Sequence, residues 1–371
     1  MQTDAAAVDL RSAGPVASIE DETPGYCVPQ GLVDVVIPMR DGAATILATI
    51  ASVLAQTHPP DHIFVIDDGS RDGGAELLRM RQFPSVSVVA TAARGVSHAR
   101  NVGIACSRAE FIAFLDCDDL WHPHKLERQL TVARENCQAA VITCGSMAFD
   151  MQHNPIPGTR FSPTLRGSVF EKTLKQGFIR GGLSSNMLVR RSALLAVGGF
   201  DENMSFAEDN DLWFRLARRY SFDYCREPLA HIVENPQSTM RRMATPALRR
   251  EVLLQILCSL EKWIDARSSN RWVLAFAARS ILTYAARERL TAKQMWRLRE
   301  EIVARAPVIG RRLAKTRALM VTAAILAGFV YLPSVWGTWS LRRRRLRSWK
   351  KRAAGTGEHT LPKSVDHEPL A

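Results

Sequence analysis

Short apolar runs alternate with helical apolar patterns over residues 33–115 of the chain. The runs at 33–38, 62–66, 85–90 and 111–115 have the length and composition of buried strands. The spacing of Ile46, Ile50, Val53 and Leu54 predicts a helix after the first run, and a second short helix is predicted over 99–107. This alternation predicts an α/β fold with a mostly parallel sheet and helices on its faces.

Carboxylates follow two of the predicted strands directly. Asp67 and Asp68 end one strand, and Asp116, Asp118 and Asp119 end another. Three crowded acids repel one another unless a divalent cation lies among them, and Mg²⁺ typically uses one or two carboxylates plus substrate phosphates. The alternative is an acidic, helix-capping turn. Because ligands of parallel sheets bind at the carboxyl ends of the strands, the two clusters favour one shared binding crevice.

Seven segments, in order and spacing, carry a resemblance to a known family. They are Val-Val-Ile-Pro at 35–38, Ser-Val-Leu-Ala-Gln-Thr at 52–57, Ile-Asp-Asp-Gly-Ser at 66–70, Ala-Arg-Asn-Val-Gly-Ile at 99–104, Phe-Leu-Asp-Cys-Asp-Asp at 114–119, Gly-Gly-Phe-Asp-Glu at 198–202 and Glu-Asp-Asn-Asp-Leu-Trp-Phe-Arg-Leu at 208–216. Over residues 32–240 the chain resembles the family 2 glycosyltransferases. The resemblance implies an α/β fold of the GT-A type, with a Rossmann-like mixed, mostly parallel sheet and flanking helices, and transfer of a sugar from a nucleotide-sugar.

On the donor side, the resemblance implies that Asp67 and Asp68 bind the nucleotide base and ribose, since carboxylates accept hydrogen bonds from imide N–H and hydroxyl groups. Pro38 is also expected among the residues that bind the nucleotide-sugar. Arg100 is expected near the base or the phosphates, where a planar cation suits an anionic ligand. Arg40 either stacks on the base or faces solvent.

Asp116 and Asp118 correspond to the D-x-D motif of the family, which implies binding of ribose and of a divalent metal, Mn²⁺ or Mg²⁺. Asp119 is a secondary candidate at the same site. Such a metal would neutralise charge on the departing nucleoside diphosphate as a Lewis acid.

Glu208 and Asp209 fall where the family carries its acceptor-side acid pair, so the resemblance implies that Asp209 is the general base and Glu208 a secondary candidate. One displacement at the anomeric carbon would invert its configuration. The plain alternative is that acids at a helix start, Asp211 included, favour the helix dipole.

Two segments depart from the family pattern. Met39, Arg40 and Asp41 occupy a loop where an aromatic residue and then Asn are usual. Further on, Val233 and Asn235 stand at the expected Arg and His positions. His231 lies four residues too early for that role, so we expect it to be structural.

The C-terminal third differs in composition. Residues 241–352 hold 26 Lys and Arg against 6 Asp and Glu, although the whole chain has a net charge of only +12. We expect a flexible tail at 1–30, a GT-A domain at 31–240, a basic helical region at 241–317, an apolar segment at 318–341, and a basic then disordered tail at 342–371. A stripe of Leu253, Leu254, Leu257 and Leu260 supports the helical assignment.

The 24 uncharged residues at 318–341 are long enough to cross a bilayer as a helix, and the arginine cluster that follows favours anionic lipid. Basic residues flank both ends, which argues against a simple span, so a re-entrant or interfacial segment is preferred over a single pass. A buried soluble hairpin is the third interpretation.

These features together predict a metal-dependent, inverting enzyme on the cytoplasmic face of the membrane. The expected donor is a UDP-sugar, and the expected acceptor is lipid-linked or another glycan, in cell-surface polysaccharide or glycolipid synthesis. One alternative is transfer to a protein or soluble acceptor, with the basic region serving only as an anchor. Another is a basic nucleic-acid-binding or scaffold protein, although no nucleic-acid motif accompanies the charge. The seven cysteines are scattered, with no C-x-x-C pair and no metal-ligand spacing, which is typical of reduced thiols in the cytosol.

Overall fold

The computed structural model describes residues 31–176, 184–234, 245–262 and 270–315, all of which belong to one compact unit. The expected tail at 1–30, apolar segment at 318–341 and basic tail at 342–371 lie outside the described residues. Within those described ranges, no helix has the length and apolar character that crossing a bilayer requires.

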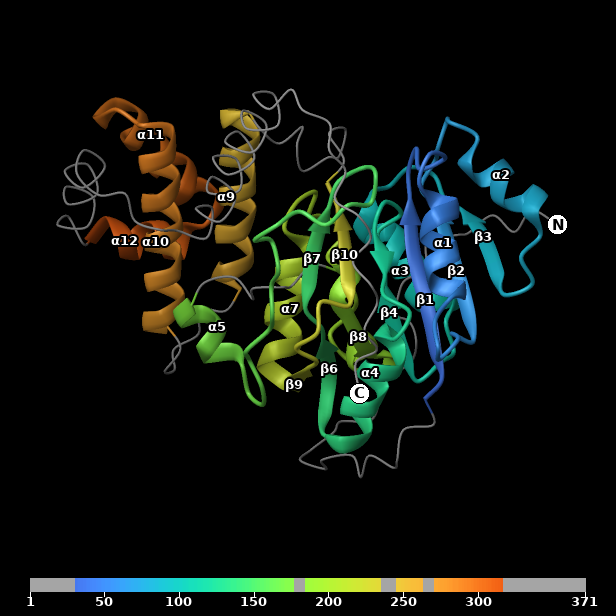
Figure 1. Cartoon of the computed structure of the whole chain (residues 1–371). Coiled ribbons are helices and arrows are strands. Elements are labelled where there is room, and N and C mark those ends of the chain that lie inside the picture. The colour runs from blue at the N-terminus through green and yellow to red at the C-terminus, as the bar shows by residue number, and fades with distance from the viewer. Residues whose placement is uncertain (1–30, 177–183, 235–244, 263–269, 316–371) are drawn as a thin grey trace, which may run out of the picture. The chain divides into compact units, whose positions relative to one another are not determined.

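A seven-stranded mixed sheet forms the centre of the first 234 residues, in the order β3-β2-β1-β4-β8-β6-β9 (Figure 1). The strands β3, β2, β1 and β4 are parallel, β8 runs antiparallel to both β4 and β6, and β9 pairs parallel with β6. The prediction of a mixed, mostly parallel sheet is confirmed. The bounds are β1 Val33–Met39, β2 His62–Asp67, β3 Val86–Ala90, β4 Phe111–Phe114, β6 Ala139–Thr143, β8 Met187–Arg190 and β9 Ser221–Tyr224.

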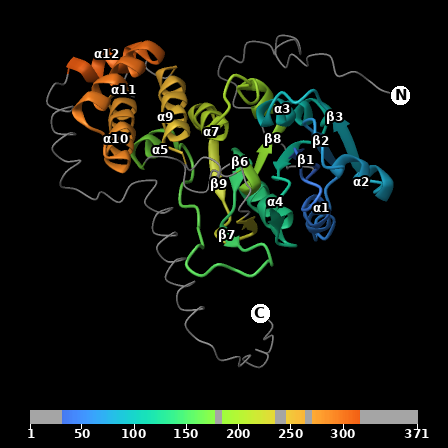
Figure 2. The same cartoon turned by 90° about the horizontal axis from the view of Figure 1, so that it is seen from above.

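Strand β1 is buried on both faces, as its continuous apolar run indicates. Its residues Val33, Val35 and Ile37 share a core cluster with Ile46 and Ile50 of α1 (Ile46–Leu54). On the opposite face, α3 (Val96–Cys106) approaches so closely that a Cβ on Gly103 would lie 2.3 Å from Val36 Cγ1. Figure 2 shows α1 and α3 on opposite sides of the parallel strands.

Local differences from the predicted elements have physical causes. Leu54 was expected on the buried face of α1 but is 40% exposed, because it falls at the last position of the helix. Helix α3 begins at Val96 and not at 99, because Gly95 has a φ of 100° and provides the break before the helix.

A second, three-stranded sheet has the order β5-β10-β7, with β5 Leu120–Trp121, β7 Ser146–Phe149 and β10 Ala230–Val233. The other elements of this region are α2 Gly74–Arg81, α4 Lys125–Glu135, α5 Phe170–Gln176, the 3₁₀ helix η1 Ser184–Asn186, α6 Arg191–Ala196 and α7 Glu208–Arg219. In the chain, β10 begins 110 residues after the start of β5. This sheet therefore brings the later segments back to the end of β4.

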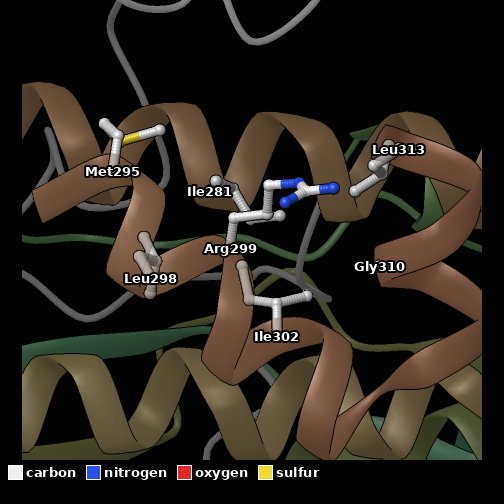
Figure 3. A pocket seen from close by; sticks show the side chains of 7 residues that line it. All are labelled: Ile281, Met295, Leu298, Arg299, Ile302, Gly310 and Leu313. Atoms are coloured by element: carbon white, nitrogen blue, oxygen red, sulfur yellow. The ribbon is translucent and has the colours of Figure 1, made fainter. Parts of the chain in front are cut away.

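The described residues after 245 form the helices α9 Pro246–Glu261, α10 Asn270–Glu288, α11 Ala292–Arg305 and α12 Pro307–Lys315. The predicted stripe of Leu253, Leu254, Leu257 and Leu260 is buried. Helix α9 contacts α7 as well as α10, α11 and α12, and α10 contacts α5, so the helical region packs on the sheet-containing part through α7 and α5. A small apolar pocket among α10, α11 and α12 is lined by Ile281, Met295, Leu298 and Ile302 (Figure 3), away from the strand-end acids.

Candidate active site

The two acidic clusters meet at one edge of the sheet, as parallel strands require. In the β1–β2 register Met39 lies opposite Asp67, and the Asp68 N–H donates to the Met39 carbonyl at 2.8 Å. The Leu115 N–H donates to the Val36 carbonyl at 3.1 Å, which carries residues 116–119 to the same edge. The expectation that the acids share one crevice therefore agrees with the sheet geometry.

Arg100 joins the two sides of this crevice. From α3, its Nη2 donates to Asp116 Oδ1 at 2.8 Å and its Nη1 donates to Glu208 Oε1 at 2.9 Å. Only 4% of the Arg100 side chain is exposed. Burial by itself lowers the pKa of Arg100, but the attraction of Asp116 and Glu208 outweighs burial and the pKa is raised. A buried guanidinium thus fixes the strand-end acid relative to the acid pair at the start of α7.

Two threonines at the start of α1 hold the backbone of the 116–119 turn. Thr45 Oγ1 and Thr49 Oγ1 both donate to the Cys117 carbonyl, at 2.7 and 2.9 Å. This arrangement fixes the turn through the residue between Asp116 and Asp118. The side chain of Asp116 is 41% exposed, so one acid of the pair is open to a ligand.

Asp119 has a different environment from its neighbours. It is buried, its Oδ2 accepts from Ser185 Oγ at 2.6 Å, and its Oδ1 accepts from the Val233 N–H at 3.0 Å. Burial, with the charges of Asp116 and Asp118, raises the pKa of Asp119. These contacts connect the acidic turn to η1 and β10, and both carboxylate oxygens are engaged within the protein.

Ser185 also contacts the acidic turn, although the sequence analysis assigns it no role. Besides donating to Asp119, its Oγ accepts from the Asp116 N–H at 3.2 Å, and its carbonyl accepts from Trp121 Nε1 at 2.9 Å. In the sequence Ser185 follows Gly181, Gly182 and Leu183, which lie outside the described residues.

The two acids after β2 also differ from each other. Asp68 accepts hydrogen bonds from Thr91 Oγ1 at 3.0 Å and from the N–H groups of Arg94 and Gly95, both at 2.8 Å, so it secures the loop before α3. Asp67 Oδ1 accepts from the Ser70 N–H at 2.9 Å. The exposed Arg40 reaches to 3.9 Å from Asp68. Asp67 and Arg40 therefore border the crevice at the end of β1, where Pro38 also lies.

Asp209 lies in the first turn of α7, next to Glu208. Its Oδ1 accepts from the Asn210 N–H at 2.7 Å and from Asn210 Nδ2 at 2.8 Å. Burial, followed by the negative charge of Glu208, raises the pKa of Asp209 to about 7. A carboxylate with a pKa near neutrality is suited to general acid–base chemistry.

His231 follows the expectation of a structural residue. Its ring packs against Phe149 at 4.3 Å and His122 at 6.1 Å between ring centroids. Burial, with a contribution from His122, lowers the pKa of His231 to about 4, so the ring is neutral at physiological pH.

The donor atoms around Asp116 fit the divalent metal that the sequence implies. In the described ranges no group of three or more His, Cys, Asp or Glu residues could hold a metal ion by itself. Asp116 and Asp118 nevertheless supply two carboxylates, and Mg²⁺ typically combines one or two carboxylates with substrate phosphates. Burial and the charge of Asp116 raise the pKa of Asp118 to about 6, so a cation at these acids would relieve their repulsion.

Parts of the chain are similar to known proteins. Residues 34–198 match the family model described as glycosyl transferase family 2. An uncharacterized glycosyltransferase of Rickettsia typhi is 29% identical over 204 residues, which are 53% of this chain and 62% of that protein. The WfgD protein of Escherichia coli, named UDP-Glc:alpha-D-GlcNAc-diphosphoundecaprenol beta-1,3-glucosyltransferase, is 35% identical over 106 residues, which are 28% of this chain and 42% of WfgD.

Among solved structures, S. aureus TarS 1–349 in complex with UDP-GlcNAc superimposes with a TM-score of 0.60 at 14% identity, over 80% of this chain and 90% of that one. The likeness confirms the GT-A fold. The chain spans less than two thirds of the length of the curated relatives named above.

Because the pKa of Asp118 is raised, we expect the ionised Asp118 carboxylate to lower the stability of the folded protein. Above about pH 6 the Asp118 charge is disfavoured in the folded protein, whereas the unfolded carboxyl ionises near its usual value of about 3.9. Asp118→Asn should therefore raise Tm at pH 8, and the gain should shrink as the pH falls toward about 4, where the wild-type carboxyl loses its charge in both states. Calorimetry of both proteins across this range, without added metal, measures the effect. A lower Tm at pH 8 would contradict the assignment.

Proposed function

We propose that the protein is an inverting glycosyltransferase that uses a nucleotide-sugar donor, because residues 34–198 match the model of glycosyl transferase family 2. The observation that carries the proposal is the bridge made by Arg100. It holds the acid pair of α7 opposite the acids at the end of β4, so a donor bound at one set of acids would present its sugar to the other.

Each side of the crevice then has a separate task. Asp67 and Arg40, beside Pro38, would bind the base and ribose of the donor, while Asp68 keeps the loop before α3 in place. Asp116 and Asp118 would hold a divalent metal, Mg²⁺ or Mn²⁺. When bound, that metal supplies positive charge that stabilises the departing diphosphate.

Asp209 would act as the general base. It accepts the proton of an acceptor hydroxyl while that oxygen forms a bond to the anomeric carbon of the sugar. The bond from the anomeric carbon to the diphosphate oxygen breaks, and its electron pair leaves with the nucleoside diphosphate. A single displacement inverts the anomeric configuration, and no covalent sugar–enzyme intermediate is required. Glu208, engaged by Arg100, would set the position and charge of the base.

A UDP-sugar donor and a lipid-linked acceptor are the substrate classes we propose. The similarity to WfgD supports both, because the name of that protein specifies UDP-Glc and a diphosphoundecaprenol acceptor. The apolar segment at 318–341 and the basic cluster at 342–352 support an enzyme on the cytoplasmic face of the membrane, where a lipid-linked acceptor for polysaccharide or glycolipid synthesis would be found.

The described basic helices favour this proposal over nucleic-acid binding. Arg249 pairs with Glu288, and Arg305 pairs with Glu251 at 2.6 Å. Arg250 pairs with Glu301 at 3.0 Å. These arginines hold the helical region together, so part of the positive charge counted in the sequence is neutralised within the fold.

The donor can be tested by measuring the binding and hydrolysis of UDP-, GDP- and dTDP-sugars with Mg²⁺, with Mn²⁺ and with a chelator. We expect a UDP-sugar to bind with metal present, and we expect the chelator and Asp118→Ala each to weaken binding and abolish transfer. Full turnover in the chelator together with an active Asp118→Ala variant would exclude a metal at these acids.

Asp209→Asn keeps the size of the side chain but cannot accept a proton. We expect turnover to fall by about 10²–10⁴-fold while the Kd for the donor stays nearly constant. In the wild-type enzyme kcat/KM should rise with pH up to about 7 and then level, because the base must be deprotonated to act. An equal loss of donor binding in Asp209→Asn would indicate a structural role at the start of α7.

Membrane association can be tested by fractionation. Apolar burial is insensitive to salt, whereas attraction of a basic cluster to anionic lipid is screened. The full-length protein should therefore stay with membranes in high salt and in carbonate, and truncation after Arg317 should release a fragment that still binds nucleotide. Release of the full-length protein by salt alone would leave only a weak electrostatic contact.

A further inference from the structure

Helix α9 presents a row of polar side chains to the segment that precedes and begins α7. Gln255, Ser259 and Lys262 are spaced four and three residues apart, so they lie on one face of the helix. The apolar stripe of α9 predicted from the sequence contains none of them. No sequence pattern assigns these three residues a role at the active site, and they lie beyond the residues that match the family model.

All three side chains contact the segment 201–211. Gln255 Oε1 accepts a hydrogen bond from the Phe206 N–H at 2.9 Å. Ser259 Oγ donates to Asp211 Oδ1 at 2.6 Å. Lys262 Nζ lies 2.7 Å from Asp201 Oδ2. Glu208 and Asp209 lie within this segment, between Phe206 and Asp211, so α9 holds the chain on both sides of the acid pair.

Asp211 is the centre of these contacts. Its side chain has no exposed surface, and its second oxygen, Oδ2, accepts from Arg215 Nε at 2.7 Å. Arg215 in turn donates through Nη1 to the carbonyls of Val197 and Gly199, at 2.8 and 2.5 Å. A buried carboxylate is costly unless hydrogen bonds satisfy it, so Asp211 stays inside only when α7, α9 and the 197–199 turn are correctly placed.

The loop that enters α7 depends on α9 for the same reason. Ala207, directly before the helix, has a φ of 57°, a left-handed conformation that costs energy for a residue other than glycine. The neighbouring Phe206 N–H has its acceptor on α9, at Gln255. Apolar packing between α7 and α9 would hold the helices together but would tolerate small sliding, whereas these hydrogen bonds fix rotation and position.

We propose that Gln255 and Ser259 of α9 are positioning residues for the general base. They act through Phe206 and Asp211 and set the place of Asp209 relative to the donor. The inference rests on the proposed role of Asp209. It gives the helical region a part in catalysis, because a displacement of about 1 Å at a catalytic group can lower the rate by about 10²-fold.

The test uses the full-length protein with a saturating donor and compares kcat with the Kd for the donor. Ser259→Ala removes the hydroxyl that Asp211 accepts from, and Gln255→Met removes the acceptor of the Phe206 N–H. Each should lower kcat by about tenfold or more while the donor Kd stays unchanged, because the acids at the ends of β2 and β4 are not touched. Ser259→Thr keeps the hydroxyl and should recover most of the lost kcat.

Ile302→Ala on α11 is the matched control. Ile302 is buried in the helical region and lines the pocket of Figure 3, and no contact described above links it to 201–211. A large-to-small change in a core lowers Tm. Well below that Tm, this variant should keep the wild-type kcat, which separates positioning of the base from loss of stability.

Two results would overturn the role of α9: wild-type kcat in both Ser259→Ala and Gln255→Met, or a loss of kcat in Ile302→Ala equal to theirs at the same folded fraction. Failure of the proposed function looks different. If Asp209→Asn remains active, the base assignment falls whatever the α9 variants do. If Asp209→Asn is inactive while the α9 variants turn over like the wild type, the role of α9 alone is excluded.

Discussion

The arrangement of the crevice depends on one buried cation. Arg100 is placed between Asp116 and Glu208, two carboxylates that would repel each other and cost free energy if they were buried without a partner. With Arg100 between them, the end of β4 and the start of α7 are held at fixed positions across the crevice. Removing one member of such a group leaves an uncompensated buried charge, so the three residues depend on one another.

The other acids of the site are less well compensated, and this has a functional consequence. The pKa of Asp118 is raised to about 6 and that of Asp209 to about 7, in both cases by burial first and by a neighbouring carboxylate second. A carboxylate kept in this state gains from a cation or a proton that arrives with the substrate. Asp119 and Asp68, by contrast, have their oxygens engaged by protein hydrogen bonds. Asp119 ties the 116–119 turn to η1 and β10, and Asp68 holds the loop before α3.

The helical region after residue 245 is connected to the site by polar contacts and not by packing alone. Its arginines form ion pairs with acids of neighbouring helices, such as Arg305 of α11 with Glu251 of α9. Its α9 also contacts the segment 201–211 through Gln255 and Ser259. The residues that match the model of glycosyl transferase family 2 end at 198, so Glu208 and Asp209 lie outside that match, and α9 contacts the chain on both sides of them.

The sequence by itself determined the parallel strands, the helices between them, and the acids at the ends of β2 and β4. These features follow from local apolar periodicity and from the rule that parallel strands end at one edge. The tertiary structure decided three further features. They are the placement of β8 antiparallel beside β4, the different environments of Asp116, Asp118 and Asp119, and the contact of α9 with α7. Their partners are far apart in the chain: Arg100 and Glu208 are separated by 108 residues, and Asp211 and Ser259 by 48. Adjacent acids look equivalent in a sequence. Only folding determines which carboxylate is buried against a hydrogen-bond donor of the protein and which is left facing the crevice.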